Sequence, residues 1–329
     1  MGKKTIGTFV ILTLLLLAAL FGAMAFGSVV LPSQRMLNAF QGSDHVAEVI
    51  LFELRLPRML GAGLAGAGLA VAGLLLQTVT DNDLCSPNII GVNAGAGLCV
   101  MIVLCVAPAL WRLLPLAAFF GALATTLVVL SVSYLGRDYE HKSTLVLAGV
   151  ALSALLNAGI SFLSLKYPDV LSSYAAFSVG GFSGVTMKQL PIPAGIIAVG
   201  FLAAWIMAPK IGLLCLGDEM AETLGIRVRA MRMAAVVVAS ALCAAVVSFA
   251  GLLGFAGLIV PHIVRRLTGA GLRTNLPLAA LCGMVVVIFS DLLGRVLFAP
   301  WELPAGIIMA FVGAPFFIYL VIRRRKRYA

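Results

Sequence analysis

Charged residues are scarce in this chain: they make up 11% of its 329 residues, whereas apolar residues make up 62% and the mean hydropathy is +1.10. A typical soluble domain is about 25% charged and about 45–50% apolar. The composition therefore excludes a water-soluble enzyme, and it also excludes a disordered or collagen-like chain. At about 20 residues per crossing, the length allows roughly ten helical crossings. We expect an all-α membrane protein with a single transmembrane domain over residues 1–329 and no room for a soluble one.

Motifs that would carry chemistry are also lacking. The sequence contains no GxxxxGK[ST] phosphate-binding loop, and its six cysteines form no CxxC pair and have no histidine nearby. Cysteines in apolar runs behave as small hydrophobic residues. We expect no disulfide, metal, cofactor or covalent catalysis, so the chain is predicted not to be an enzyme. The net charge of +10 is attributed to membrane orientation, and not to nucleic-acid binding.

The first apolar run follows Lys3 and Lys4 and extends to Leu31. A basic start, an apolar run and the small residues Ala23 and Ala25 are also typical of a signal peptide. The apolar core of a signal peptide has about 7–15 residues, however, and the uncharged stretch 5–34 is much longer. We interpret it as a retained first span.

The number of spans depends on the long apolar run 233–264, which three glycines and Pro261 interrupt. It is either one tilted helix or two short spans that meet at a glycine break. Two spans place both termini on the cytoplasmic side, together with most of the Lys and Arg residues. One span would place Arg265, Arg266 and the basic tail outside, against the positive-inside bias. We therefore predict ten spans, over residues 6–31, 59–79, 88–109, 113–135, 143–165, 189–208, 233–250, 252–267, 275–297 and 303–322. The segment 167–188 is expected to form a short helix and turn at the outer surface.

Acidic residues are rare inside the predicted spans. Of the 13 Asp and Glu residues, only Asp291 lies within one, and Arg295 four residues later predicts an ion pair on the same helix face. Secondary carriers and proton pumps need ionisable groups inside the membrane. The sequence therefore indicates that energy for active transport would come from another polypeptide.

The longest predicted inside loop, 209–232, contains a short amphipathic pattern. Met220, Ala221 and Leu224 are expected on one helical face with acidic residues around it, and Gly225 is expected to end the helix. Such a helix suits a groove in a partner protein. The alternative, a helix lying on the membrane surface, would favour Lys and Arg on its polar face.

Several motifs resemble a known family. Arg55-Leu56-Pro57-Arg58, the Gly/Ala-rich helix to Gln77, and the stretches 82–87, 91–96, 216–219, 254–265, 291–295 and 302–306 look like those of iron-siderophore, haem and cobalamin permeases. These are membrane subunits of type II ATP-binding-cassette (ABC) importers. The resemblance runs in order from about residue 35 to residue 318.

The resemblance implies ten transmembrane helices in two inverted-repeat halves and a set of partners. The partners are a second permease chain (an identical copy or a close paralogue), two cytoplasmic ABC ATPase subunits and an external or periplasmic substrate-binding protein. The implied location is the cytoplasmic (inner) membrane of a bacterium or archaeon, with both termini cytoplasmic. The implied substrate is an iron-siderophore, with haem, cobalamin and molybdate as alternatives.

The resemblance also implies site residues. The binding protein would contact Arg55, Arg58 and Arg295; the channel and its gate would contain Gln77, Asn82, Leu84, Ser143 and Thr144; the ATPase would be coupled through Asp218, Glu219, Ala221, Glu222, Leu224 and Gly225. The chain departs from the family at Asp83 and Cys85, where Pro and Ala are usual, and in region 177–183, where a Trp is common. The alternatives to an importer subunit are an ATP-independent channel, a secondary carrier of the same helical plan, or a structural scaffold.

Overall fold

The computed structural model describes residues 2–29, 31–135 and 141–325, and this part of the chain contains helices and no strands. The long helices are α1 (Lys3–Ala25), α4 (Leu56–Val79), α5 (Val92–Val106), α6 (Leu114–Leu135), α7 (His141–Lys166), α9 (Pro191–Leu213), α11 (Val228–Ala250), α12 (Ala256–Thr268), α13 (Leu272–Val296) and α14 (Ala305–Arg325). The short ones are α2 (Ser33–Phe40), α3 (His45–Glu48), η1 (Val49–Arg55), η2 (Pro108–Leu113), η3 (Pro168–Val170), α8 (Leu171–Val179), η4 (Leu214–Leu216) and α10 (Asp218–Thr223). The predicted all-α class is confirmed.

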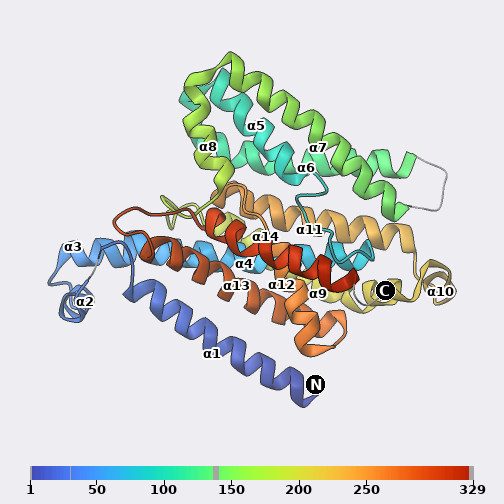
Figure 1. Cartoon of the computed structure of the whole chain (residues 1–329), viewed down its shortest axis with the longest axis horizontal. Coiled ribbons are helices and arrows are strands. Elements are labelled where there is room, and N and C mark those ends of the chain that lie inside the picture. Colours follow the sequence, from blue (N-terminus) through green and yellow to red (C-terminus); the bar gives the residue numbers. More distant parts are fainter. Residues whose placement is uncertain (1, 30, 136–140, 326–329) are drawn as a thin grey trace.

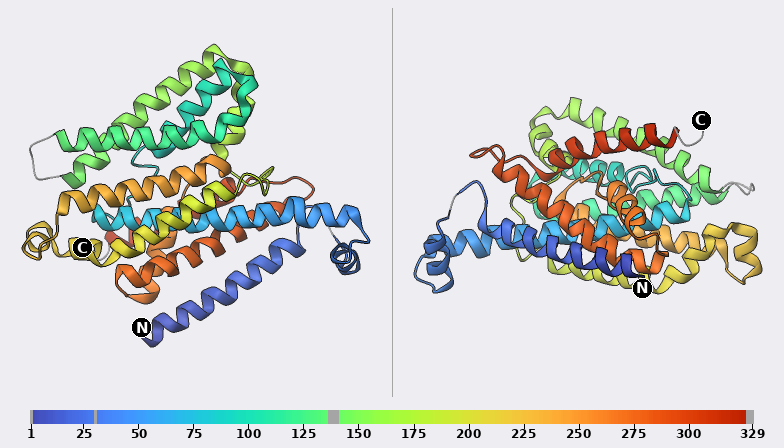
Figure 2. Two further views of the ribbon diagram at one scale, coloured as in Figure 1. Left: turned by 180° about the vertical axis from the view of Figure 1, so that it is seen from behind. Right: turned by 60° about the horizontal axis from the view of Figure 1, so that its bottom comes forward.

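Helix α4 forms the centre of the bundle. It packs against α13, α11, α12 and α9, whereas α5, α6 and α7 form a separate group that contacts the rest through α11 (Figures 1 and 2). Glycines let these helices approach closely: a Cβ on Gly73 would lie 1.8 Å from the carbonyl oxygen of Gly257, and one on Gly66 would lie 2.1 Å from that of Gly283. The hydrophobic effect does not drive helix association in lipid, so close packing between small residues stabilises the bundle instead.

Seven described helical segments are long and apolar enough to cross a membrane, and α5 and α14 contain shorter apolar helices. With α12, these helices overlap the ten predicted spans. Their ends differ from the prediction: α1 ends at Ala25, and α5 is confined to Val92–Val106 because turns occupy the preceding connection. The predicted helix and turn at 167–188 are present as α8 and the turns that follow it.

The predicted glycine break is present between α11 and α12. Gly251 has φ +71° and Phe255 has φ +64°, so the backbone leaves the helical region at both positions. A Cβ on Gly251 would lie 2.4 Å from the carbonyl oxygen of Phe177, which excludes a larger residue there. The long run 233–264 is therefore two helices.

The bundle has two ends, which we name after the predicted orientation. The outer end contains α2, α3, residues 26–29 and 31–32, and the connections 180–190 and 297–304. The inner end contains α10, the start of the connection 80–91 and the connection 269–271. The start of α1 and the end of α14 lie toward the inner end, as an even number of crossings requires (Figure 1).

Candidate functional site at the two ends of the bundle

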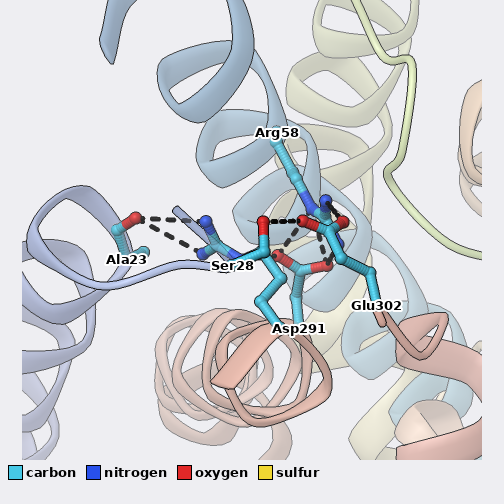
Figure 3. A network of polar contacts seen from close by, with 6 residues as sticks. Ala23, Ser28, Arg58, Asp291 and Glu302 are labelled. Atoms are coloured by element: carbon cyan, nitrogen blue, oxygen red, sulfur yellow. Dashed lines mark hydrogen bonds and ion pairs between the residues drawn. The ribbon is translucent and has the colours of Figure 1, made fainter. Parts of the chain in front are cut away.

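A buried network of charges joins five segments at the outer end (Figure 3). Arg58, in the first turn of α4, donates from Nε to both carboxylate oxygens of Asp291 in α13, at 3.0 Å each. Its Nη1 donates to Oε2 of Glu302, in the connection after α13, at 2.5 Å. The side chains of Arg58 and Asp291 are 11% and 2% exposed. Burial of this kind is tolerated only where each charge is paired and hydrogen-bonded.

The network extends to α1 and to the connection after it. Arg295 pairs with Asp291 at 3.2 Å and donates from both Nη atoms to the carbonyl oxygen of Ala23, at 3.3 Å. Ser28 donates to Oε1 of Glu302 at 2.6 Å. Burial disfavours the charge of Glu302, but the hydrogen bonds from Ser28 and Arg58 outweigh this effect and hold the pKa of Glu302 below its usual range.

Arg55 lies beside this network and is held by backbone oxygens. It donates to the carbonyl oxygens of Met24, Ala25 and Val29, at 2.6, 3.0 and 2.6 Å. The last carbonyls of a helix have no partner within it, so a guanidinium at the end of α1 satisfies them and opposes the negative end of the helix dipole.

The three arginines predicted to contact a binding protein are thus buried in this structure. Arg55, Arg58 and Arg295 are 4%, 9% and 3% exposed, and each already has partners within the chain. The predicted pair of Asp291 with Arg295 is confirmed, but the sequence analysis missed Arg58 and Glu302 as further partners. Two neighbouring cavities, of about 280 and 370 Å³, are both lined by Arg58, Phe182, Ser183 and Glu302, so the network faces open volume at this end.

At the inner end, Gln77 connects α4 to α12. The amide is 1% exposed; Nε2 donates to the carbonyl oxygens of Gly257 and Leu258 at 3.3 Å each, and Oε1 accepts from Arg265. Arg265 also pairs with Asp83 at 3.1 Å. The connection after α4 is therefore joined to the last turn of α12 through Asp83.

The other residues of the predicted gate occupy two places. Asn82 and Leu84 lie in the connection after α4, where the Asn82 side chain accepts from the backbone N–H of Leu84 at 3.0 Å. Thr144 lies in the first turn of α7, and the side chain of Ser143 lies outside the described residues. Cys85 is fully buried. Gln77, Asn82 and Leu84 thus lie close together at the end of α4 and in the connection after it. Their role in gating remains a prediction.

Helix α10 is the predicted short helix of the inner loop. Gly225 has φ +79°, and the N–H groups of Gly225 and Ile226 donate to the carbonyls of Glu222 and Ala221, which confirms the predicted glycine cap. Of the predicted apolar face, Met220 and Leu224 are 54% and 55% exposed, but the prediction is wrong for Ala221, which is fully buried.

The acids of α10 also divide into two kinds. Glu219 and Glu222 are exposed. Asp218 instead pairs with Arg232 of α11, at 2.7 and 2.5 Å. The outward surface of α10 and its C-cap is therefore acidic and apolar, with Glu219, Met220, Glu222 and Leu224 exposed.

Comparison with known proteins places this arrangement in a family. The model of the FecCD transport family matches residues 14–323. The Fe(3+)-citrate import system permease protein YfmE of Bacillus subtilis is 35% identical over 320 residues, which are 97% of this chain and 96% of that protein. The hemin transport system permease protein HmuU of Yersinia pestis is 32% identical over 96% of this chain and 95% of its own.

Solved structures agree with this placement. An inward-facing conformation of a metal-chelate type ABC transporter superposes with a TM-score of 0.82 and 27% identity, over 98% of this chain and all of that one. PsaBC from Streptococcus pneumoniae, with a TM-score of 0.58, 14% identity and coverage of 86% of this chain and 94% of its own, shares the fold alone. The family model, the relatives and the fold agree over almost the whole chain, and the protein is a multi-pass membrane permease that belongs to the FecCD transport family.

Proposed function

We propose that this chain is the permease subunit of an ABC importer. Two permease chains would form the translocation channel, two cytoplasmic ATPase subunits would drive it, and an external binding protein would deliver the substrate. The inner end would then face the cytoplasm. The observation that carries the proposal is α10, a short helix that, with its C-cap Leu224, presents Glu219, Met220, Glu222 and Leu224 outward at the end toward which the start of α1 and the end of α14 lie. An acidic and apolar helix of this kind suits a partner protein better than a lipid surface.

The proposed second permease chain is supported by the exposed face of α7. Asn157, in the second half of α7, has an exposed amide side chain. Ser161, one helical turn further, is also exposed, but its hydroxyl donates to the carbonyl oxygen of Asn157 at 2.9 Å, so the inference depends on Asn157. Polar side chains within a membrane helix usually face other protein or a water-filled path, because lipid offers them no partner. We infer that this face of α7 borders the channel between two permease chains.

The proposed substrate is an iron-siderophore or a related metal chelate, such as haem or cobalamin. The relatives carry names that refer to Fe(3+)-citrate, achromobactin, hemin and ferric enterobactin. These substrates differ in shape but are all iron chelates. Delivery by a binding protein would allow a shared permease fold to carry them without a tight site of its own.

Co-purification tests the proposal. The chain is tagged at its C-terminus, extracted from its native host in mild detergent, and examined for a bound ATPase subunit. We expect an ATPase with the wild type and its loss or uncoupling with Glu222→Arg, because the exposed acid of α10 becomes basic. Glu53→Arg, the same charge reversal at an exposed outer-end position, is the control and retains the ATPase. A wild type that purifies alone and transports without ATP would instead establish the channel or carrier alternative.

A further inference from the structure

Asp218 and Arg232 form a two-bond ion pair between the predicted coupling helix and the bundle. Nη1 of Arg232 donates to Oδ2 of Asp218 at 2.7 Å, and Nη2 donates to Oδ1 at 2.5 Å. The arginine side chain is 7% exposed and that of the aspartate is 35% exposed. Two parallel bonds fix direction as well as distance, because the planar guanidinium matches the carboxylate at both ends.

Little else sets the orientation of α10. The helix has six residues, Asp218–Thr223, which is far too short to be stable alone. Ala221 is its fully buried residue, and a single methyl group restricts rotation weakly. The chain enters α10 through Gly217 at φ +98° and leaves it through Gly225 at φ +79°, both conformations that depend on glycine. The ion pair is therefore the strongest directional contact between α10 and α11.

Arg232 is well placed to pass a movement of α10 through the bundle. It lies near the start of α11, which packs along α4 and α9 and extends to the outer end. There, Ala250 and the break at Gly251 line the same cavity as Arg58 and Glu302. One helix thus connects the pair with Asp218 to the cavity beside the outer charge network.

We propose that Arg232 is a positioning residue that holds α10 at a fixed angle on α11, so that movement of a bound ATPase is transmitted to the membrane helices. Asp218 is then assigned to this internal contact and not to the ATPase surface, which is left to Glu219, Met220, Glu222 and Leu224. This inference depends on the proposed importer function. It adds a residue outside the predicted coupling segment and separates binding of the ATPase from coupling to it.

The experiment compares binding, ATP hydrolysis and transport in the complete transporter reconstituted in proteoliposomes. In Arg232→Gln, we expect the ATPase subunit to remain bound and to hydrolyse ATP, while the substrate transported per ATP falls about tenfold, a typical size for the loss of coupling between two sites. Arg232→Lys is expected to recover only part of this ratio, because a single ammonium cannot form both bonds. The double exchange of Asp218→Arg and Arg232→Asp is expected to recover more than either single change. Arg266→Gln removes an exposed inner-end guanidinium and is the control.

A second measurement needs only the permease in detergent. Spin labels on Thr223→Cys of α10 and Met233→Cys of α11, both at accessible positions, report the angle between the helices in a Cys215→Ser background. We expect a narrow distance distribution in the parent protein and a broad one with Arg232→Gln. An unchanged distribution would overturn the proposal.

The transport results separate this proposal from the one on which it depends. A wild type without an ATPase refutes the importer function before any variant is compared. A wild type with its ATPase, but an Arg232→Gln variant that either transports normally per ATP or loses the ATPase in proportion to transport, refutes the positioning role alone.

Discussion

At the outer end, Arg58, Asp291, Arg295 and Glu302 lie in one network in which the Asp291 side chain is 2% exposed. At the inner end, the ion pair of Arg265 with Asp83 involves side chains that are 29% and 45% exposed. There, α4 and α12 meet through the close backbone contact of Gly73 with Gly257 and the amide of Gln77. The contacts of α4 thus differ: at the outer end it is joined to α13 by buried charges, and at the inner end to α12 by close packing with an ion pair at its edge. The other inner-end pair, Asp218 with Arg232, attaches α10 to α11.

This difference implies that opening an ion pair costs more free energy at the outer end than at the inner end. Removing one partner from a buried ion pair leaves an unpaired charge, which costs several kcal/mol, whereas a partly exposed pair exchanges its bonds with water at little cost. We therefore expect the outer network to act as a unit, formed or broken as a whole. The inner ion pair can open without a large loss of stability, which suits a region proposed to gate the channel.

Asp291→Asn should have the largest effect. The change leaves Arg58 and Arg295 buried beside a neutral amide, and removing one partner of a buried pair costs about 3–5 kcal/mol. The thermal unfolding midpoint in mild detergent should fall strongly. Asp83→Asn makes the same chemical change in the exposed pair and is the control. Equal midpoints for the two variants would contradict the comparison.

Gly73→Ala should have the next largest effect, because it opposes the close packing of the inner end. The added Cβ would lie 1.8 Å from the carbonyl oxygen of Gly257, so α4 and α12 must separate. Overpacking of this kind costs about 1–3 kcal/mol. Gly63→Ala, in the same helix, is the control, because the nearest atom to its Cβ is Cδ1 of Ile288 at 3.5 Å, an ordinary contact. If both variants unfold at the same temperature, packing at Gly73 is not what joins the inner end.

Glu302→Gln should have a smaller effect that depends on pH. The pKa of Glu302 is lowered in the folded chain, so this carboxylate stabilises the fold above the pKa of an ordinary glutamate, about 4.3. The stabilisation is lost as pH falls through the lower, folded pKa. The wild type should therefore be more stable than Glu302→Gln at neutral pH, and the difference should shrink in acid. A difference that is constant over this range would show that Glu302 contributes no charge to the outer network.

Much of the difference between the outer and inner ends could not be predicted from the sequence. The run lengths and the glycine cluster predicted the helices and the break at Gly251, because these are local properties. The pair of Asp291 with Arg295 was also predicted, because residues four apart share a helix face. The bond from Arg58 to Asp291 was not predicted, because it joins residues 233 positions apart and depends on how α4 packs on α13.

For the candidate sites, too, the sequence predicted the local features and missed contacts that depend on the fold. The sequence located α10 and its cap at Gly225, since a glycine after an amphipathic turn is a local signal. It placed Ala221 on the face for a partner, whereas Ala221 is fully buried. It also did not predict the pair of Asp218 with Arg232, because a turn between α10 and α11 brings these two residues together and no periodic pattern contains that turn.

Asp83→Asn should have the smallest effect on stability and therefore tests the comparison most directly. The pair with Arg265 is partly exposed, and such pairs contribute about 0–1 kcal/mol. Arg265 also keeps its bond to Gln77, so its guanidinium is not left without a partner. We expect an unfolding midpoint close to that of the wild type, measured in the same detergent as Asp291→Asn, together with a changed rate of substrate uptake in proteoliposomes. A large fall in the midpoint would show that the inner end, like the outer one, is joined by its charges. An unchanged midpoint with unchanged uptake would remove Asp83 from the proposed gate while leaving the contrast in stability intact.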